Sequence, residues 1–315
     1  MLTRGEFDAI LADRRNLVID GALATELEER GYDLNHAMWS AKILKDDPDS
    51  IRKVHLDYFL AGADVAITAS YQASTQGLHH HYHMREDEAV NLIKKSVKLA
   101  QQARDEAYCQ GVDPARKLLV AGSVGPYGAY LADGSEYRGD YKRAKEEFQV
   151  FHRPRIRALV DAGVDLLAIE TIPKMEEVEA VLEMLRDEFP GALFWISCTL
   201  RNAHSLSDGT LIKHLLSLVE RHADQLVAVG INCIPAGMVL GALQHMRMYT
   251  HLPLLCYPNS GEIWDARTKT WSSDRSEGGN LDREVKKWQA TGARLIGGCC
   301  RTGPTYTKLV AKAIA

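Results

Sequence analysis

Short apolar runs, bounded by glycine, proline and charged residues, recur along the whole chain. Each run is apolar almost throughout, which is typical of strands that are covered on both faces in a parallel sheet. Runs of this length, flanked by turn-forming residues, predict strands. The eight predicted strands cover 17–21, 65–70, 118–125, 166–171, 194–200, 228–233, 254–259 and 295–300.

Amphipathic helices are predicted between these strands. Residues 86–108, 176–189 and 210–223 carry apolar side chains at three- and four-residue spacings, with charged residues on the other face. The segments "LAGADVAITAS", "DAGVDLLAIET" and "ATGARLIGGCC" each run from a helix end through a glycine into a strand. Glycine suits the left-handed position after a helix, so the recurring junction indicates repeated βα units.

Eight βα units predict a (β/α)8 TIM-type barrel that covers 1–315 as a single domain. A doubly wound sheet is the alternative, but it normally has fewer strands and a glycine-rich first turn. No long stretch of serine, glycine or proline divides the chain, so we expect no internal linker.

Composition narrows the class of protein. The chain has 315 residues, 46% hydrophobic and 25% charged, and its net charge of −4 gives no reason to expect a nucleic-acid partner. No apolar run reaches the ~20 residues that cross a bilayer, and no secretory leader is recognisable at the N-terminus. Six cysteines do not make a disulfide framework in a chain of this length, so we expect a reducing cytoplasm. A monomer and a homodimer are both compatible with the sequence.

Polar residues gather where the predicted strands end. In a barrel these ends form one rim, the face on which active sites lie. Cys233 ends the sixth strand, and the adjacent Cys299 and Cys300 end the eighth, so the rim would bring the three thiols together. Adjacent cysteines rarely form a disulfide with each other, because the eight-membered ring that results strains the peptide bond between them. The other polar strand-end residues are Asp20, Ser70, Glu170, Thr171, Asn232 and Asn259.

Three converging thiolates suit a soft, tetrahedral cation, and Zn2+ with a fourth position open is the leading choice. Glycines before the pair would let consecutive side chains turn toward one ion. The alternative is that Cys233 is a small core residue and the adjacent pair is chance. We interpret the remaining cysteines, Cys109, Cys198 and Cys256, as packing residues.

The chemistry of such an ion follows from its charge. Three thiolates around Zn2+ leave a net charge of −1, which is poor for polarising a carbonyl but suits a further thiolate. A free thiol with a pKa of about 8.5 is only slightly ionised at neutral pH, and binding to the metal releases its proton. The predicted chemistry is therefore alkyl transfer to sulfur.

Several motifs resemble the homocysteine S-methyltransferase family: "GGCCR" near the C-terminus, "GINC" upstream and "DGALATELEERG" near the start. The blocks "WSAKIL", "HLDYFLAGADVAITASYQAS", "AGSVGPYGAYLADGSEYRGDY", "FHRPR" and "YPNSGE" resemble the branch that uses S-methylmethionine, and often S-adenosylmethionine, as methyl donor. The resemblance covers essentially the whole chain and implies a (β/α)8 barrel. It also implies one zinc ion on Cys233, Cys299 and Cys300, and in-line transfer of a methyl group from the donor to L-homocysteine, which gives L-methionine.

The resemblance implies further roles at the rim. Asp20, beside Gly21, and Glu170 would hold the homocysteine amino group through charge-assisted hydrogen bonds. Ser70 and Asn232 would contact the substrate carboxylate, orient ligands, or simply brace the backbone. A sulfonium is a cation that aromatic faces attract. Candidate donor-site residues are Tyr71, Tyr127, Tyr130, Tyr257, Asn259 and Glu262.

Three alternatives stay open at this point. The same fold could use another donor such as betaine, although the S-methylmethionine-type blocks disfavour it. The adjacent cysteines could form a redox-sensing pair. A zinc ion could also stabilise a non-catalytic scaffold, in which case its four coordination positions would be closed.

Overall fold

A computed structural model describes residues 1–34, 40–260, 264–265, 270–271 and 281–314. Eight parallel strands lie in the order β1-β12-β9-β8-β5-β4-β3-β2, and a parallel bridge between Ile19 and Val65 joins the two ends of this sheet. The sheet is therefore a closed barrel, which confirms the predicted fold class. Its strands are β1 (Leu17–Val18), β2 (Val65–Ile67), β3 (Leu119–Val124), β4 (Leu166–Ile172), β5 (Phe194–Cys198), β8 (Leu226–Pro235), β9 (Leu254–Asn259) and β12 (Ala293–Ile296).

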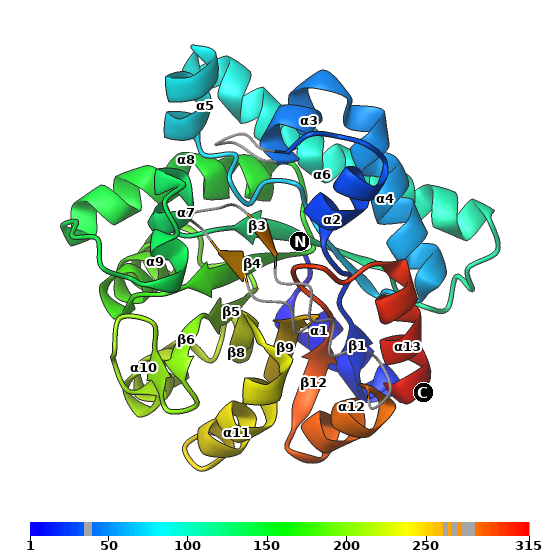
Figure 1. Ribbon diagram of the computed structural model, residues 1–315, viewed down its shortest axis with the longest axis vertical. Helices are drawn as coiled ribbons and strands as arrows, with labels where there is room; N and C mark the ends of the chain where they lie inside the picture. The colour runs from blue at the N-terminus through cyan, green and yellow to red at the C-terminus, as the bar shows by residue number, and fades with distance from the viewer. Residues whose placement is uncertain (35–39, 261–263, 266–269, 272–280, 315) are drawn as a thin grey trace.

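Helices form the outer layer, as Figure 1 shows in a view down the barrel. Each of eight helices packs against the next, and the last returns to the first, so the layer is also closed. Helix α4 ends at Gly62, in the left-handed conformation with φ 113°, as the repeated glycine junction predicts. The eight helices are α4 (Pro48–Ala61), α6 (Glu86–Cys109), α8 (Lys145–Asp161), α9 (Met175–Glu188), α10 (Ile212–Val219), α11 (Ala236–Arg247), α12 (Leu281–Ala290) and α13 (Pro304–Ile314).

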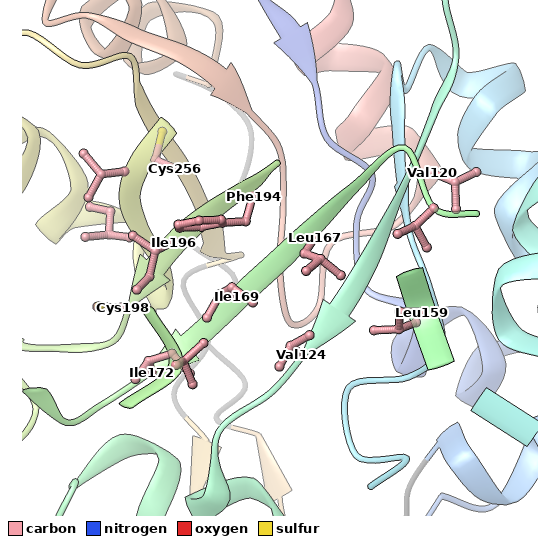
Figure 2. Packing of buried hydrophobic residues seen from close by; sticks show 14 of the residues in the cluster. Val120, Val124, Leu159, Leu167, Ile169, Ile172, Phe194, Ile196, Cys198 and Cys256 are labelled. Atoms are coloured by element: carbon pink, nitrogen blue, oxygen red, sulfur yellow. The ribbon is translucent and has the colours of Figure 1, made fainter. Parts of the chain in front are cut away.

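Strand residues alternate between two cores. Leu167 and Ile169 of β4 lie in the large cluster between sheet and helices, whereas Leu166 and Ala168 lie in the cluster that fills the barrel. Figure 2 shows the first cluster, in which side chains of β3, β4 and β5 pack together with Leu159 of α8. Both strand faces are thus buried, which explains their nearly continuous apolar sequence.

Helix α1 (Arg4–Arg14) closes the amino-terminal end of the barrel. Its Phe7 and Leu11 belong to the same cluster as the barrel interior. The backbone N–H of Leu2 donates to the carbonyl of Asp165, just before β4, over 2.9 Å. The opposite end of the barrel, where the strands finish, is therefore the end available for a site.

Short helices and strands also lie in the loops, and the sequence pattern did not predict them. No helix among the described residues is long and apolar enough to cross a membrane. The additional elements are α2 (Leu23–Glu29), α3 (Ser40–Asp46), α5 (Thr75–Tyr82), α7 (Tyr127–Leu131), η1 (Ser135–Tyr137), η2 (Glu220–His222), β6 (Leu200–Asn202), β7 (Ser205–Leu206), β10 (Trp264–Asp265) and β11 (Thr270–Trp271).

Close contact between β8 and β9 depends on Gly230. A Cβ at this position would lie 1.8 Å from the carbonyl oxygen of Leu255. We expect Gly230→Ala to lower the free energy of unfolding by about 3 kcal/mol, because two backbones would have to separate. Chemical denaturation measures the effect. Gly237→Ala is the matched control, since a Cβ there meets no atom within 4 Å. An equal stability of the two variants would contradict this account.

Candidate active site and metal centre

Three thiols meet at the carboxyl ends of two strands. The Sγ of Cys233, in β8, lies 3.0 Å from the Sγ of Cys299 and 3.5 Å from that of Cys300. The three sulfurs all lie within 4.8 Å of one another, and all three cysteines are free thiols. Among the described residues, this is the group of histidine, cysteine or acidic side chains arranged to hold a metal ion. The predicted convergence of the three cysteines is therefore present.

The loop after β12 reaches this position by close backbone packing. The sequence predicted that Cys299 and Cys300 end the last strand. Strand β12 instead ends at Ile296, and the two cysteines lie in the loop that follows it. The N–H of Gly298 donates to the carbonyl of Asp20 over 3.1 Å, and that of Cys299 donates to Pro258 over 2.7 Å. A Cβ on Gly298 would lie 2.2 Å from the Oγ1 of Thr302. The need for glycine is thus a steric one.

Cys233 is held in an unusual backbone conformation, with φ 55°. Thr171, which follows Glu170 in β4, is also left-handed, with φ 62°. Asn232 joins these two places: its Oδ1 accepts from the N–H of Thr171 over 2.9 Å, and its Nδ2 donates to the Thr171 hydroxyl over 2.8 Å. A β-branched residue is costly in this region, so the paired bonds stabilise the turn. They fix Glu170 and Cys233 relative to each other.

The thiols share protons unequally. Hydrogen bonds that Cys299 and Cys300 donate to Cys233 hold the pKa of the Cys233 thiol well below its usual range. The same bonds raise the pKa values of Cys299 and Cys300, since they stabilise the protonated forms. The hydroxyl of Tyr137 lies 3.5 Å from the Cys233 sulfur. The hydrogen bonds therefore favour a thiolate on Cys233 over one on either neighbour.

Two buried carboxyl groups lie beside the thiols. Asp20 follows β1, and its Oδ2 accepts from the N–H of Ile67 over 2.9 Å. Glu170 accepts hydrogen bonds from the hydroxyls of Ser123 and of Tyr257, the latter over 3.1 Å. Burial raises the pKa of Glu170 to about 7, and burial followed by the neighbouring Glu170 raises that of Asp20 well above its ordinary value. Such a pair is suited to binding a positively charged group.

A cavity of about 150 Å3 connects these groups. Of the residues singled out from sequence, the cavity is lined by Asp20, Gly21, Tyr71, Glu170, Thr171, Cys233, Tyr257, Cys299 and Cys300. The rim thus brings together residues that are up to 280 positions apart in the chain, from Asp20 to Cys300.

Ser70 and Asn232 lie outside the lining. The Ser70 hydroxyl donates to the carbonyl of Ser123 over 2.8 Å, and Asn232 is occupied by Thr171. Among the alternatives open from sequence, their contacts favour backbone bracing.

Three further candidate donor-site residues, Tyr127, Tyr130 and Asn259, do not line the cavity either. Tyr127 and Tyr130 pack against Phe151 with ring centroids 5.0 and 5.7 Å away. Asn259 is buried outside the cavity lining, and Glu262 lies outside the described residues.

The remaining cysteines behave as packing residues in two cases out of three. Cys198 and Cys256 are buried in the core between sheet and helices (Figure 2), where burial raises the pKa of both thiols. Cys109 is exposed at the end of α6, so the packing interpretation is wrong for that residue.

Sequence reasoning missed several lining residues, above all Glu136 and Tyr137. They lie in η1, in the long connection between β3 and α8, and not at a strand end. Both residues lie in the block "AGSVGPYGAYLADGSEYRGDY". Its resemblance to the family was the sequence feature that could have identified them as site residues. Ser123 was missed because it lies inside β3 and not at a strand end, although its hydroxyl donates to Glu170.

The motif "FHRPR" supports the cavity wall from behind. Arg155, in α8, is 1% exposed and donates to the carbonyl of Tyr71 over 2.6 Å and to that of Gly125 over 2.5 Å. His152 bonds to Glu177 over 2.8 Å, and Glu177 also accepts from the N–H of Tyr127 over 2.6 Å. Burial lowers the pKa of Arg155 to about 10, which leaves it charged at neutral pH. The network fixes Tyr71 at the cavity.

Comparisons with known proteins bear on this site. The family model described as homocysteine S-methyltransferase matches residues 17–314. The chain is 53% identical over 296 residues to homocysteine S-methyltransferase of Escherichia coli, covering 94% of each chain. It is 45% identical over 297 residues to homocysteine S-methyltransferase YbgG of Bacillus subtilis, covering 94% of this chain and 93% of the relative.

A solved structure is similar in the same way. The homocysteine methyltransferase MmuM of Escherichia coli, in its metallated form, superimposes with a TM-score of 0.87 at 50% identity and covers 96% of this chain and 98% of its own. The two proteins thus share sequence and fold over nearly their full length. In the present chain the three thiols lie at the rim of this barrel. The chain belongs to the homocysteine S-methyltransferase family and is an enzyme of that family.

Proposed function

We propose that the chain transfers a methyl group from S-methylmethionine, or from S-adenosylmethionine, to L-homocysteine and so forms L-methionine. The observation that carries the proposal is the convergence of Cys233, Cys299 and Cys300 beside the carboxyl groups of Asp20 and Glu170 in one cavity. A group that binds a thiol and a group that binds an ammonium are the two that homocysteine requires.

We propose one zinc ion on the three cysteines. Zinc–thiolate bonds of about 2.3 Å in a tetrahedron would separate the sulfurs by roughly 3.8 Å. The present separations of 3.0 and 3.5 Å from Cys233 need only a small opening to reach this value. When bound, zinc would hold a substrate sulfur as the nucleophilic thiolate. Three protein ligands leave one position for that sulfur, which argues against a closed structural site.

The carboxyl pair would orient the acceptor. Asp20 and Glu170 lie at the ends of different strands, and their oxygens are already fixed by Ile67, Ser123 and Tyr257. An ammonium group between them would favour the ionised form of both carboxylates and would remove the cost of their mutual repulsion. Fixing the amino end leaves the acceptor sulfur directed toward the cysteines.

The reaction balances without a general base during transfer. The acceptor thiol would release its proton to solvent when it binds, before the methyl group moves. The carbon–sulfur bond of the sulfonium donor then breaks as the new bond to the acceptor sulfur forms, and the donor leaves as a neutral thioether. A fixed acceptor and a fixed donor place the two sulfurs in line, which supplies much of the rate through orientation.

The metal ligands can be tested directly. We expect about one zinc ion per wild-type chain, and we expect Cys233→Ser and Cys300→Ser to lose both zinc and turnover while they stay folded, since one missing thiolate leaves the ion two protein ligands. Zinc content by mass spectrometry and folding by circular dichroism are the measurements.

Cys109→Ser is the matched control, because this exposed cysteine lies outside the cluster. It should retain zinc and activity. Full activity of Cys233→Ser would refute the metal site. A wild-type protein that binds zinc but has no activity would indicate a zinc-stabilised scaffold. A wild-type protein that binds no zinc, and whose Cys299 and Cys300 react with peroxide, would indicate a redox sensor.

Donor choice is tested by steady-state rates on zinc-loaded protein with L-homocysteine. We expect S-methylmethionine and S-adenosylmethionine to react at least about 100-fold faster than betaine. A thioether leaves a sulfonium more easily than an amine leaves a quaternary ammonium. Near-equal rates with all three donors would overturn the donor assignment.

The buried state of Glu170 predicts a pH dependence of stability in metal-free, reduced protein. The folded state keeps the proton of Glu170 up to a pKa of about 7, whereas the ordinary pKa is 4.5. Unfolding between these values releases a proton, so Glu170 lowers the stability of the folded state as the pH rises.

We therefore expect Glu170→Gln to gain stability relative to wild type by about 1.4 kcal/mol per pH unit across this window. Denaturation curves at several pH values measure it. Glu179→Gln, on the exposed face of α9, controls for loss of a carboxylate elsewhere. A constant difference between Glu170→Gln and wild type would show that Glu170 is ionised in the fold throughout.

A further inference from the structure

Glu136 is a buried carboxyl group at the cavity with no assigned role. Its side chain lines the same cavity as the three cysteines, and the residue is 8% exposed. Within the described part of the chain, its Oε2 has no hydrogen-bond partner. A buried carboxyl oxygen without a partner is costly, so its presence at a cavity points to a ligand that supplies one.

The backbone around Glu136 is fixed. Its carbonyl accepts from the hydroxyl of Thr199 over 2.9 Å, and the preceding N–H of Ser135 donates to the Oδ1 of Asp133 over 2.9 Å. A Cβ on Gly128 would lie 2.7 Å from the nitrogen of Glu136, so these two segments of the loop are in close contact. The backbone that carries the Glu136 side chain is therefore fixed beside the cavity.

The neighbouring cation does not satisfy it. The guanidinium of Arg138 bonds to the Oδ2 of Asp140 over 2.9 Å and lies 3.6 Å from the Oδ1 of Asp133. Arg138 is directed to the exposed side of the loop, since both of these acidic side chains are more than half exposed. Glu136 is thus left to face the cavity.

The cavity accordingly has two acidic regions. Asp20 and Glu170 interact with each other, whereas Glu136 lies next to Tyr137, whose hydroxyl is 3.5 Å from the Cys233 sulfur. Glu136, Glu170 and Cys233 all line the same cavity, so both acidic regions face the space beside the thiol cluster. Tyr71 and Tyr137 add aromatic rings to the region of Glu136.

We propose that Glu136 is the counter-ion of the sulfonium group of the methyl donor. This inference rests on the proposed function: the carboxyl pair takes the ammonium of the acceptor, and Glu136, with Tyr71 and Tyr137, takes the positive sulfur of the donor. Transfer of the methyl group turns that sulfur into a neutral thioether. The attraction to Glu136 then disappears, so the same residue favours binding of the donor and release of the product.

The charge on the donor declines as the methyl group leaves, so Glu136 stabilises the bound donor more than the transition state. In Glu136→Gln we expect the KM for S-methylmethionine to rise at least roughly 30-fold, the loss typical of a buried charge pair. The kcat should stay within a few-fold of wild type. Zinc content and the KM for L-homocysteine should not change.

Calorimetric binding to zinc-loaded protein separates the sulfonium from the amino group. S-methylmethionine and L-methionine share the amino and carboxyl groups and differ in the charge on sulfur. Wild type should prefer S-methylmethionine, and Glu136→Gln should lose that preference, whereas Glu136→Asp, which keeps the charge, should recover part of it. Glu179→Gln, on the exposed face of α9, should behave as wild type.

The outcomes separate the two proposals. Wild type without methyl transfer from any sulfonium would refute the proposed function. An active wild type with an unchanged KM in Glu136→Gln would refute the role of Glu136. Equal weakening of both ligands in Glu136→Gln would overturn it as well, because the partner of Glu136 would then be the amino group.

Discussion

The paired hydrogen bonds between Asn232 and Thr171 hold the site together. They join the carboxyl end of β8 to that of β4, and each residue is adjacent in sequence to a residue of the cavity, Cys233 in one case and Glu170 in the other. Two positive φ angles at non-glycine residues persist there because the surrounding contacts determine them. The Cys233 thiol and the Glu170 carboxyl group thereby share one rigid support.

Much of the fold could be predicted because the chain repeats one unit. Continuous apolar runs predict buried parallel strands. The glycine at the end of α4 adopts the left-handed conformation that the repeated junction predicts. Strand ends were less accurate: β1 stops at Val18 and β12 at Ile296, and beyond them isolated contacts, such as the bridge between Ile19 and Val65, continue the sheet. The small loop elements leave no periodic signal, so α7 and η1 could not be predicted.

The candidate site divides along the same line. Residues at strand ends, such as Asp20, Glu170 and Cys233, were found because a barrel collects those ends on one rim. The same rule also selected Ser70 and Asn232, whose side chains turn into the wall. It could not find Glu136 or Ser123, since the first lies in a loop and the second is inside a strand. The position of a residue in a strand can be predicted from the sequence. The direction in which its side chain points also depends on tertiary contacts.

Closure of the barrel floor by α1 has a consequence for the order of events. In the described part of the chain, the interior is filled with side chains and Phe7 and Leu11 close its base, so the cavity opens on the side of the strand ends. Any ligand of the cavity then enters and leaves from that side. If two ligands were to bind one above the other in this cavity, the deeper one would have to bind first and leave last.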